Sequence, residues 1–246
     1  MKTKRAISFL MSAMLLLSMG AYAGAQEASV STSRPILEAR IDTTKQKAEL
    51  KTFDQIVKEI SIAADRDVQD IRNELIENKT SELKRNSPSF FFQKSNTELR
   101  QIAVKALAAQ QYTTYSYDSF PVLSKGSLKY QPKQILFYCA VTPQAGQEWR
   151  LSINRVEHIV FDRSNAYTGS GATSAKQFSG TTYVKLENDR NIYFSLDGDF
   201  YDYGTTTYSG NLGINIGQYA TIGFSISNSS NWFQFMYHPG RYTVYW

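Results

Sequence analysis

The first part of the chain has the hydrophobic spacing of helices. Between residues 45 and 79, apolar residues recur every three or four positions, which places them on one face of a helix. The charged step at 65–67 interrupts this stripe, so the pattern predicts either one bent helix or two short ones. Thr52 and Gln55 have the spacing of an N-terminal capping box. The apolar positions on the two sides of the interruption are Leu50, Phe53, Ile56, Val57, Ile60, Ala63 and Ala64, and then Val68, Ile71 and Leu75.

A third helix is predicted further along. Asp67 is placed to cap a new start after the interruption, and Ser95 with Glu98 forms another capping box. The aromatic cluster at 90–92 is expected to anchor the helices to the rest of the protein. The apolar stripe of the third helix consists of Leu99, Ile102, Ala103, Ala106 and Leu107. Residues 45–110 are therefore predicted to be a small helical segment.

The remainder of the chain, 111–246, has the period of strands. The continuous apolar run at 135–141 is typical of a central strand, and later segments alternate apolar and polar residues. Asp197-Gly198 and His238-Pro239-Gly240 are predicted to be turns. Other alternating segments include Ile192, Phe194 and Leu196, then Leu212, Ile214 and Ile216, and then Ala220, Ile222, Phe224 and Ile226. The fold class predicted is α+β, with the helical segment followed by an antiparallel β-sandwich, or alternatively by a β-barrel.

One stretch of the strand region, residues 203–240, contains no Lys, Arg, Asp or Glu. Aliphatic residues alternate there with Gly, Ser, Thr and Asn, so one face of each strand is apolar and the other is small and polar. Three interpretations follow. Both faces can be covered inside the protein, the polar face can be an open binding surface, or the segment can be a membrane-inserting hairpin.

Aromatic residues near the polar face favour a ligand that is neutral and polar, such as a glycan. Rings cover the C–H faces of sugars, and amide or hydroxyl groups fix their orientation. Aromatic residues make up 13% of the chain, which is a high share. The candidate ligand-binding residues are Tyr201, Tyr203, Tyr208, Tyr219, Trp232 and Tyr237.

The N-terminus has the order of a secretory signal peptide. Lys2, Lys4 and Arg5 precede an apolar run that ends in a series of small residues, with cleavage expected after Ala23 or Ala25. We therefore predict a signal peptide over 1–25, a polar linker over 26–44, and a secreted, extracellular protein without a transmembrane helix after cleavage.

Charge and composition remove several classes of function. The net charge is +5, and loss of the three basic residues of the signal leaves +2, so we expect no nucleic-acid partner. A single Cys excludes an intrachain disulfide, and the presence of only two His removes most histidine-based metal sites. We expect no cofactor and no metal, and the sequence leaves the oligomeric state open.

The residues that could carry nucleophilic chemistry are isolated. Cys139 stands in an apolar strand, so a buried, unreactive thiol is expected. The competing interpretation pairs Cys139 with His158 and Asp162, although their spacing does not demand such contact. His158 and His238 are interpreted as surface or hydrogen-bonded core residues.

Three carboxylates lie close together in the sequence, at Asp197, Asp199 and Asp202. They could bind Ca²⁺ or serve as a glycosidase pair, but neighbours on one hairpin rarely face each other across a cleft. We interpret them as solvated acids of a turn, and the Gly/Ser-rich segment 169–176 as a flexible loop rather than a phosphate loop.

The sequence thus predicts a secreted, non-enzymatic protein that presents a neutral, aromatic-rich β surface to a glycan or another extracellular or cell-envelope ligand. A membrane-active, pore-forming or toxin-like protein is the first alternative. An extracellular hydrolase is the second.

Overall fold

The computed structural model describes residues 49–86, 94–118, 121–124, 127–163, 167–168, 175–209, 213–228 and 231–244. The chain divides into residues 1–38 and residues 39–246, and the described residues all belong to the second unit. The predicted signal peptide and polar linker, the aromatic cluster at 90–92 and most of the predicted loop at 169–176 lie outside the described residues.

The helical segment contains α1 (Phe53–Ala64), α2 (Val68–Asn86) and α4 (Asn96–Ala108). The charged interruption separates two helices rather than bending one, because Asp65 takes a left-handed conformation with φ of 52° and ends α1. Asp67 then accepts hydrogen bonds from the backbone N–H groups of Gln69 and Asp70 at the start of α2.

Both predicted capping boxes are present. The Thr52 hydroxyl accepts from the N–H of Gln55, and the Gln55 side chain accepts from the N–H of Thr52. Ser95 and Glu98 make the same reciprocal bonds at the start of α4. These bonds satisfy N–H groups that a helix start otherwise leaves without a partner, which is why the helices begin at these residues.

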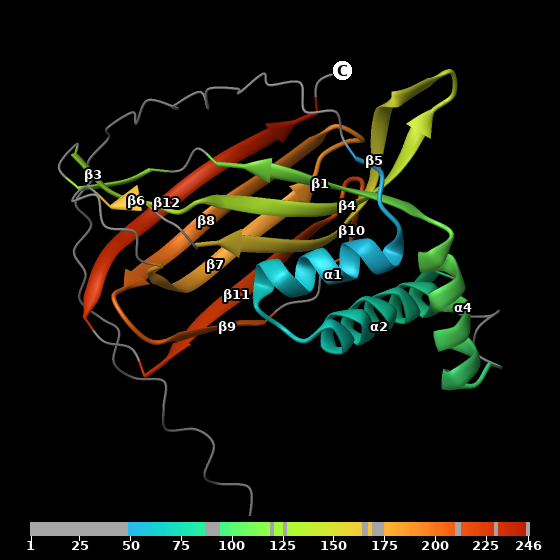
Figure 1. The fold of residues 1–246 in the computed structure, drawn as a ribbon, viewed down its shortest axis with the longest axis horizontal. Coiled ribbons are helices and arrows are strands. Elements are labelled where there is room, and N and C mark those ends of the chain that lie inside the picture. The colour runs from blue at the N-terminus through green and yellow to red at the C-terminus, as the bar shows by residue number, and fades with distance from the viewer. Residues whose placement is uncertain are drawn as a thin grey trace, which may run out of the picture. The chain divides into compact units, whose positions relative to one another are not determined.

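The strands form two large antiparallel sheets and one small one (Figure 1). The four-stranded sheet has the order β1-β4-β5-β10, with bounds Gln111–Tyr117, Gln134–Gln144, Gln147–Asp162 and Ile214–Asn215. The five-stranded sheet has the order β12-β8-β7-β11-β9, with bounds Trp232–Thr243, Asn191–Tyr201, Gln177–Leu186, Tyr219–Ser227 and Thr205–Ser209. The small sheet has the order β2-β3-β6, with bounds Val122–Ser124, Ser127–Gln131 and Tyr167–Thr168.

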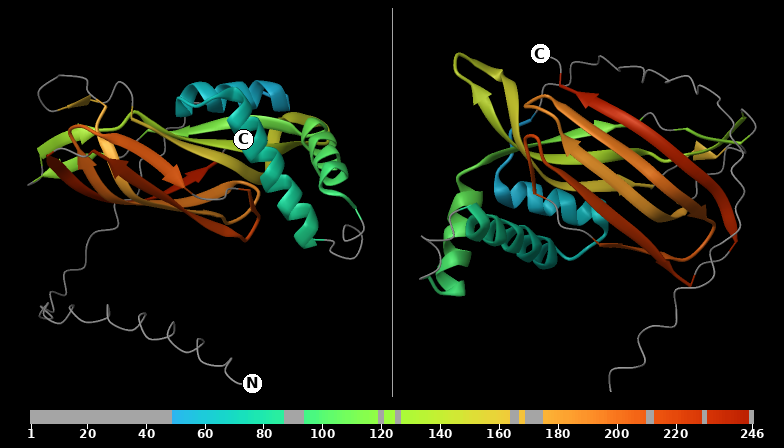
Figure 2. Two further views of the ribbon diagram at one scale, coloured as in Figure 1. Left: turned by 90° about the horizontal axis from the view of Figure 1, so that it is seen from below. Right: turned by 180° about the vertical axis from the view of Figure 1, so that it is seen from behind.

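The two large sheets pack face to face, and the helices lie on the other side of the four-stranded sheet (Figure 2). The sandwich core between the sheets includes Phe137, Ile153, Phe178, Phe194 and Phe200. The second core joins α1, α2 and α4 to Tyr112, Tyr138, Ala140 and Val160 of the four-stranded sheet. The predicted α+β sandwich is therefore confirmed, and neither large sheet closes into the alternative barrel.

A bulge in β5 changes the alternation of its side chains. Tyr138 of β4 is opposite His158, whereas the next residue, Cys139, is opposite Val156, so Glu157 is an extra residue in β5. Val156 and Ile159 both pack in the sandwich core. The extra residue lets Glu157 and His158 lie together on the helix side of the sheet, between those two inward positions.

The predicted turn at Asp197-Gly198 is wrong, because both residues lie within β8. Gly198 is directly opposite Gly180 of β7, and a Cβ added to Gly180 would lie 2.2 Å from the backbone oxygen of Asp197. Glycine is therefore required there by the close approach of two strands and does not mark a turn. The chain bends after β8 instead, at residues 202–204.

The predicted turn at His238-Pro239-Gly240 is also wrong, because these residues lie inside β12. β12 is an edge strand, where a proline without an N–H group can be accommodated. Gly240 lies against the ring of Phe194, whose Cζ would be 2.4 Å from an added Cβ.

The strand predicted around Ile214 and Ile216 is much shorter than expected. Ile214 belongs to the two-residue strand β10 and is buried, whereas Ile216 is exposed in a turn with Gly217, whose φ is 80°. Leu212, predicted on the same face, lies outside the described residues.

Candidate functional site

The outward side of the five-stranded sheet is the principal candidate surface. In β8, Phe194, Leu196 and Phe200 are buried in the sandwich core, so the alternate residues project away from it. Residues that are directly opposite each other on paired strands lie on the same side of the sheet, so the pairing with β8 identifies the outward residues of β7 and β12, and the pairing of β11 with β7 identifies those of β11. We call the outward side chains of these four strands the open face, and its aromatic members are Tyr183, Tyr193, Tyr201, Tyr219, Trp232, Phe235 and Tyr237.

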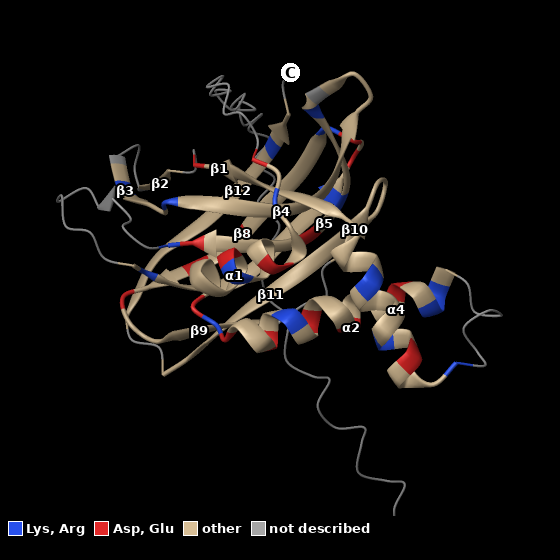
Figure 3. Cartoon of the chain, turned by 45° about the vertical axis from the view of Figure 1, so that its right-hand side comes forward, with Lys and Arg blue, Asp and Glu red and all other residues tan. Residues whose placement is uncertain are grey.

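The charge-free strands leave their polar side accessible. On β11, Thr221, Ser225 and Ser227 are exposed, while Ile222 is buried in the sandwich core. Figure 3 shows that charged residues are concentrated on the helices and that β9 and β11 carry none. The interpretation in which both sides of these strands are covered is therefore wrong for the described residues.

Two groups of aromatic side chains lie on the open face. In the first, the rings of Tyr183 and Tyr219 are stacked with centroids 5.4 Å apart, and Tyr193 is 6.0 Å from Tyr183. The second group follows β12, where Trp232 is 57% exposed, Tyr237 is 52% exposed and Phe235 is 49% exposed. Side chains this large and this exposed add apolar area to an otherwise polar surface.

Two carboxylates lie between these groups. Asp197 is opposite Tyr237 on β12 and Thr181 on β7. Asp199 is opposite Phe235 and Ser179, and its carboxylate accepts a hydrogen bond of 2.7 Å from the indole Nε1 of Trp232.

Cations are few on the open face. Arg241 of β12 is engaged by Glu187, with two bonds of 2.8 and 3.1 Å. Lys185 lies opposite Tyr193, six residues along β8 from Asp199. Among the described residues, no ion pair within 4.0 Å is formed by Asp197 or Asp199. The face therefore offers aromatic rings, hydroxyl groups and hydrogen-bond acceptors in one plane.

The sequence-predicted residues divide between the two sides of the sheet. Tyr201, Tyr219, Trp232 and Tyr237 lie on the open face, and Tyr203 is 73% exposed in the bend that follows β8. Tyr208 of β9 faces the other way and packs against the sandwich core.

Three aromatic members of the open face were not predicted from the sequence. Tyr183 and Tyr193 precede the charge-free stretch that contains most of the predicted residues, and Phe235 lies within that stretch but was not among the candidate ligand-binding residues. The alternation of Ile192, Phe194 and Leu196 was the available signal, because it places Tyr193 on the opposite side of β8.

The candidate nucleophile, Cys139, and the candidate base, His158, do not lie together. The Cys139 side chain packs in the sandwich core, whereas His158 lies against Tyr138 and Tyr208 on the other side of β5. Burial raises the pKa of the Cys139 thiol well above its usual range and lowers the pKa of His158 to about 4. Asp162 interacts instead with Gln134 and Lys133.

The structure does not bring Asp197, Asp199 and Asp202 together as one set of ligands. No group of three or more His, Cys, Asp or Glu side chains is arranged to hold a metal within the described ranges. Asp197 and Asp199 lie side by side on one strand, and Asp202 pairs with Lys176 at 2.5 Å. Glycosidase carboxylates must instead face each other across the substrate.

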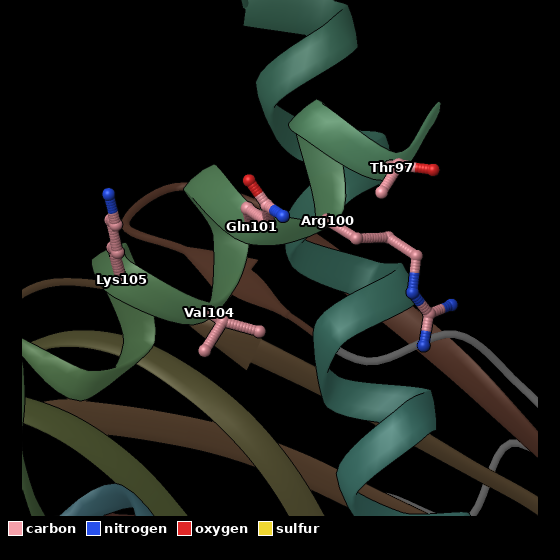
Figure 4. A pocket seen from close by; sticks show the side chains of 5 residues that line it. All are labelled: Thr97, Arg100, Gln101, Val104 and Lys105. Carbon is pink, nitrogen blue, oxygen red and sulfur yellow. The ribbon is translucent and has the colours of Figure 1, made fainter. Parts of the chain in front are cut away.

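A hollow of about 500 Å³ lies along α4, but its lining is poorly suited to holding a substrate (Figure 4). Its five lining side chains, which Figure 4 shows projecting from this one helix, are Thr97, Arg100, Gln101, Val104 and Lys105. Because they come from a single element, they do not surround a substrate as convergent groups from several elements do.

Comparison with known proteins identifies no relative of this chain. No family model matches the chain, and the searches of curated proteins and of solved structures find no match. Within the described residues, no helix is both long and apolar enough to cross a membrane.

Proposed function

We propose that this protein is a non-enzymatic binding protein whose open face contacts a polysaccharide chain outside the producing cell. The observation that supports this most directly is the exposure of aromatic rings beside hydrogen-bonding groups on an uncovered sheet. Secretion is part of the proposal, and it rests on the predicted signal peptide over 1–25.

The chemistry of the open face suits a hydroxyl-rich polymer. Tyr237 and Phe235 offer ring surface to sugar C–H groups, while Asp197 and Asp199 accept hydrogen bonds from sugar hydroxyls. Thr181 and Ser179, on the other side of these carboxylates, add groups that both donate and accept. A polyanion such as nucleic acid is disfavoured because carboxylates occupy the middle of the face.

The dimensions favour a chain over a small molecule. Tyr193 and Tyr201 are eight positions apart on β8, which corresponds to about 26 Å at the usual rise of a strand. A small ligand would be held in a concave site that surrounds it, whereas this surface is the outer side of a sheet. An extended polymer can cover both aromatic groups at once.

The test is co-sedimentation of the purified protein with insoluble cellulose, chitin and peptidoglycan, beside a variant carrying Phe235→Ala and Tyr237→Ala. We expect at least one polymer to retain the wild-type protein and the double variant to bind it at least tenfold more weakly. Trp149→Ala is the matched control, because Trp149 is 55% exposed on β5 of the other large sheet and should not affect binding.

Circular dichroism and thermal unfolding would establish that the variants fold. Equal binding by the double variant and the wild type would contradict the proposal, as would an equal loss in Trp149→Ala. Release of soluble sugar would instead indicate a hydrolase, and dye release from liposomes would indicate a membrane-active protein.

A further inference from the structure

Two carboxylates without a cationic partner lie side by side in the middle of the open face. Asp197 and Asp199 are two positions apart on β8, so both project outward and are about 7 Å apart along the strand. Among the described residues, neither of them forms an ion pair, and the bond from Trp232 Nε1 to Asp199 Oδ1 is the one side-chain hydrogen bond that either accepts. Three of the four carboxylate oxygens are therefore available to a ligand.

The cations of the open face do not compensate this charge. Arg241, on the neighbouring strand, is engaged by Glu187 with bonds of 2.8 and 3.1 Å. Lys185 is opposite Tyr193, which is four positions along β8 from Asp197, or about 13 Å. Like charges at neighbouring outward positions repel each other, and a cation that contacts both of them offsets that repulsion. The middle of the open face therefore favours a ligand that carries positive charge.

An aromatic ring adjoins each of the two carboxylates. Tyr237 is directly opposite Asp197, and Phe235 is directly opposite Asp199. Residues in such pairs have Cβ atoms about 5 Å apart, so one bound group can contact both members. A ring face attracts both C–H groups and cations, and a carboxylate forms short hydrogen bonds with ammonium groups. A sugar that carries an ammonium group therefore uses the ring and the charge of the acid together, whereas a neutral sugar forms only hydrogen bonds with the acid.

The net charge of the chain separates this local attraction from a general one. Lys and Arg together exceed Asp and Glu by five, so the chain as a whole repels a polycation. A cationic polymer that binds must then contact a region in which carboxylates lie without cations beside them. The open face provides such a region at Asp197 and Asp199, next to aromatic rings that can hold sugar units.

We propose that the polysaccharide bound by the open face carries free amino groups, as partly de-N-acetylated chitin does. Its ammonium groups pair with Asp197 and Asp199, and its sugar rings lie on Phe235 and Tyr237. This inference rests on the proposed function and specifies the charge of the polymer. Fully acetylated chitin and cellulose offer similar sugar faces without the cation, so they bind the same surface more weakly.

Binding isotherms on chitin particles test the charge of the ligand. Wild-type protein is added, in mildly acidic buffer, to fully acetylated chitin and to the same particles after partial de-N-acetylation. Exposed ion pairs contribute modestly, so we expect the de-N-acetylated particles to be bound about fivefold more tightly. Acetylating their amino groups again should remove that difference, as should salt at about 1 M, where the screening length is about 3 Å.

Asp197→Asn combined with Asp199→Asn removes both charges but keeps an oxygen that can accept from Trp232 Nε1. We expect this double variant to bind the two kinds of particle equally, within about twofold, and to bind acetylated chitin as the wild type does. Asp54→Asn combined with Glu77→Gln is the matched control. These side chains are 76% and 67% exposed on α1 and α2, so the same change of net charge away from the open face should leave the preference intact.

Equal binding of both kinds of particle by the wild type would overturn this inference and leave polysaccharide binding in place. No retention on any polysaccharide would overturn polysaccharide binding and this inference with it. A preference that persists without the two acids would overturn the inference alone, as would equally tight binding to polylysine-coated beads, because charge without sugar would then suffice. Circular dichroism establishes that the variants fold, and the re-acetylation and salt measurements need no variant.

Discussion

The two large sheets contribute to one core, yet their outer sides differ. The outer side of the four-stranded sheet buries Tyr138, Ala140 and Val160 beneath the helices. The equivalent side of the five-stranded sheet exposes Tyr237, Phe235 and hydroxyl side chains. Strand alternation therefore determines which residues point outward, while the composition of those outward positions determines which sheet is covered.

The two outer sides should differ most when a tyrosine on each of them is truncated. Tyr138 is 1% exposed, so Tyr138→Ala should lower the free energy of unfolding by about 3–5 kcal/mol. Tyr237→Ala, on the open side, should change it by less than about 1 kcal/mol. Urea denaturation measures both values, and similar losses in the two variants would show that the five-stranded sheet is also covered.

A smaller effect is expected from the two sides of β8 itself. Gly198→Ala places a Cβ 2.4 Å from the backbone oxygen of Ser179, so it should lower the free energy of unfolding by about 1–3 kcal/mol. Ser195→Ala, at an outward position of the same strand, should cost less than about 0.5 kcal/mol. Thermal unfolding followed by circular dichroism compares them, and a Gly198→Ala protein as stable as wild type would contradict the close strand approach.

The smallest effect concerns the helical cover. Thr52→Ala removes the N-terminal cap of α1 and should cost about 1 kcal/mol of stability. Because α1 packs on the four-stranded sheet, polysaccharide binding by the folded variant should equal that of wild type. Weaker binding at the same folded fraction would indicate that the helices contribute to the ligand surface.

Local features of the fold were predictable where neighbours in sequence determine them. The caps at Thr52 and Ser95 and the alternation through Ile192 and Phe194 belong to this class. The predicted turns at Asp197-Gly198 and at 238–240 failed because glycine was interpreted as a turn residue. Gly198 is required by its close approach to Gly180 of β7, and Gly240 by its contact with the ring of Phe194 in β8. Both contacts arise from the pairing of strands and join residues that are not neighbours in the sequence.

The candidate surface was predictable only in part, for the same reason. Trp232 and Tyr237 belong to the uncharged stretch, and their exposure agrees with its interpretation as an open surface. Tyr183 becomes their companion only through the register of β7 with β8. Tyr208 was assigned to the surface, but the register of β9 with β11 places its ring on the core side. Side-chain direction in a short edge strand follows from pairing, which periodicity alone does not determine.

The most direct measurement of the open face is hydroxyl-radical footprinting by mass spectrometry, on the protein alone and on the protein bound to the polysaccharide that retains it. We expect Trp232, Phe235 and Tyr237 to react readily in the free protein and to lose most of that reactivity on the polymer, while Trp149 stays reactive in both. Unchanged labelling of the three β12 rings on the polymer, or protection confined to Trp149, would contradict this expectation.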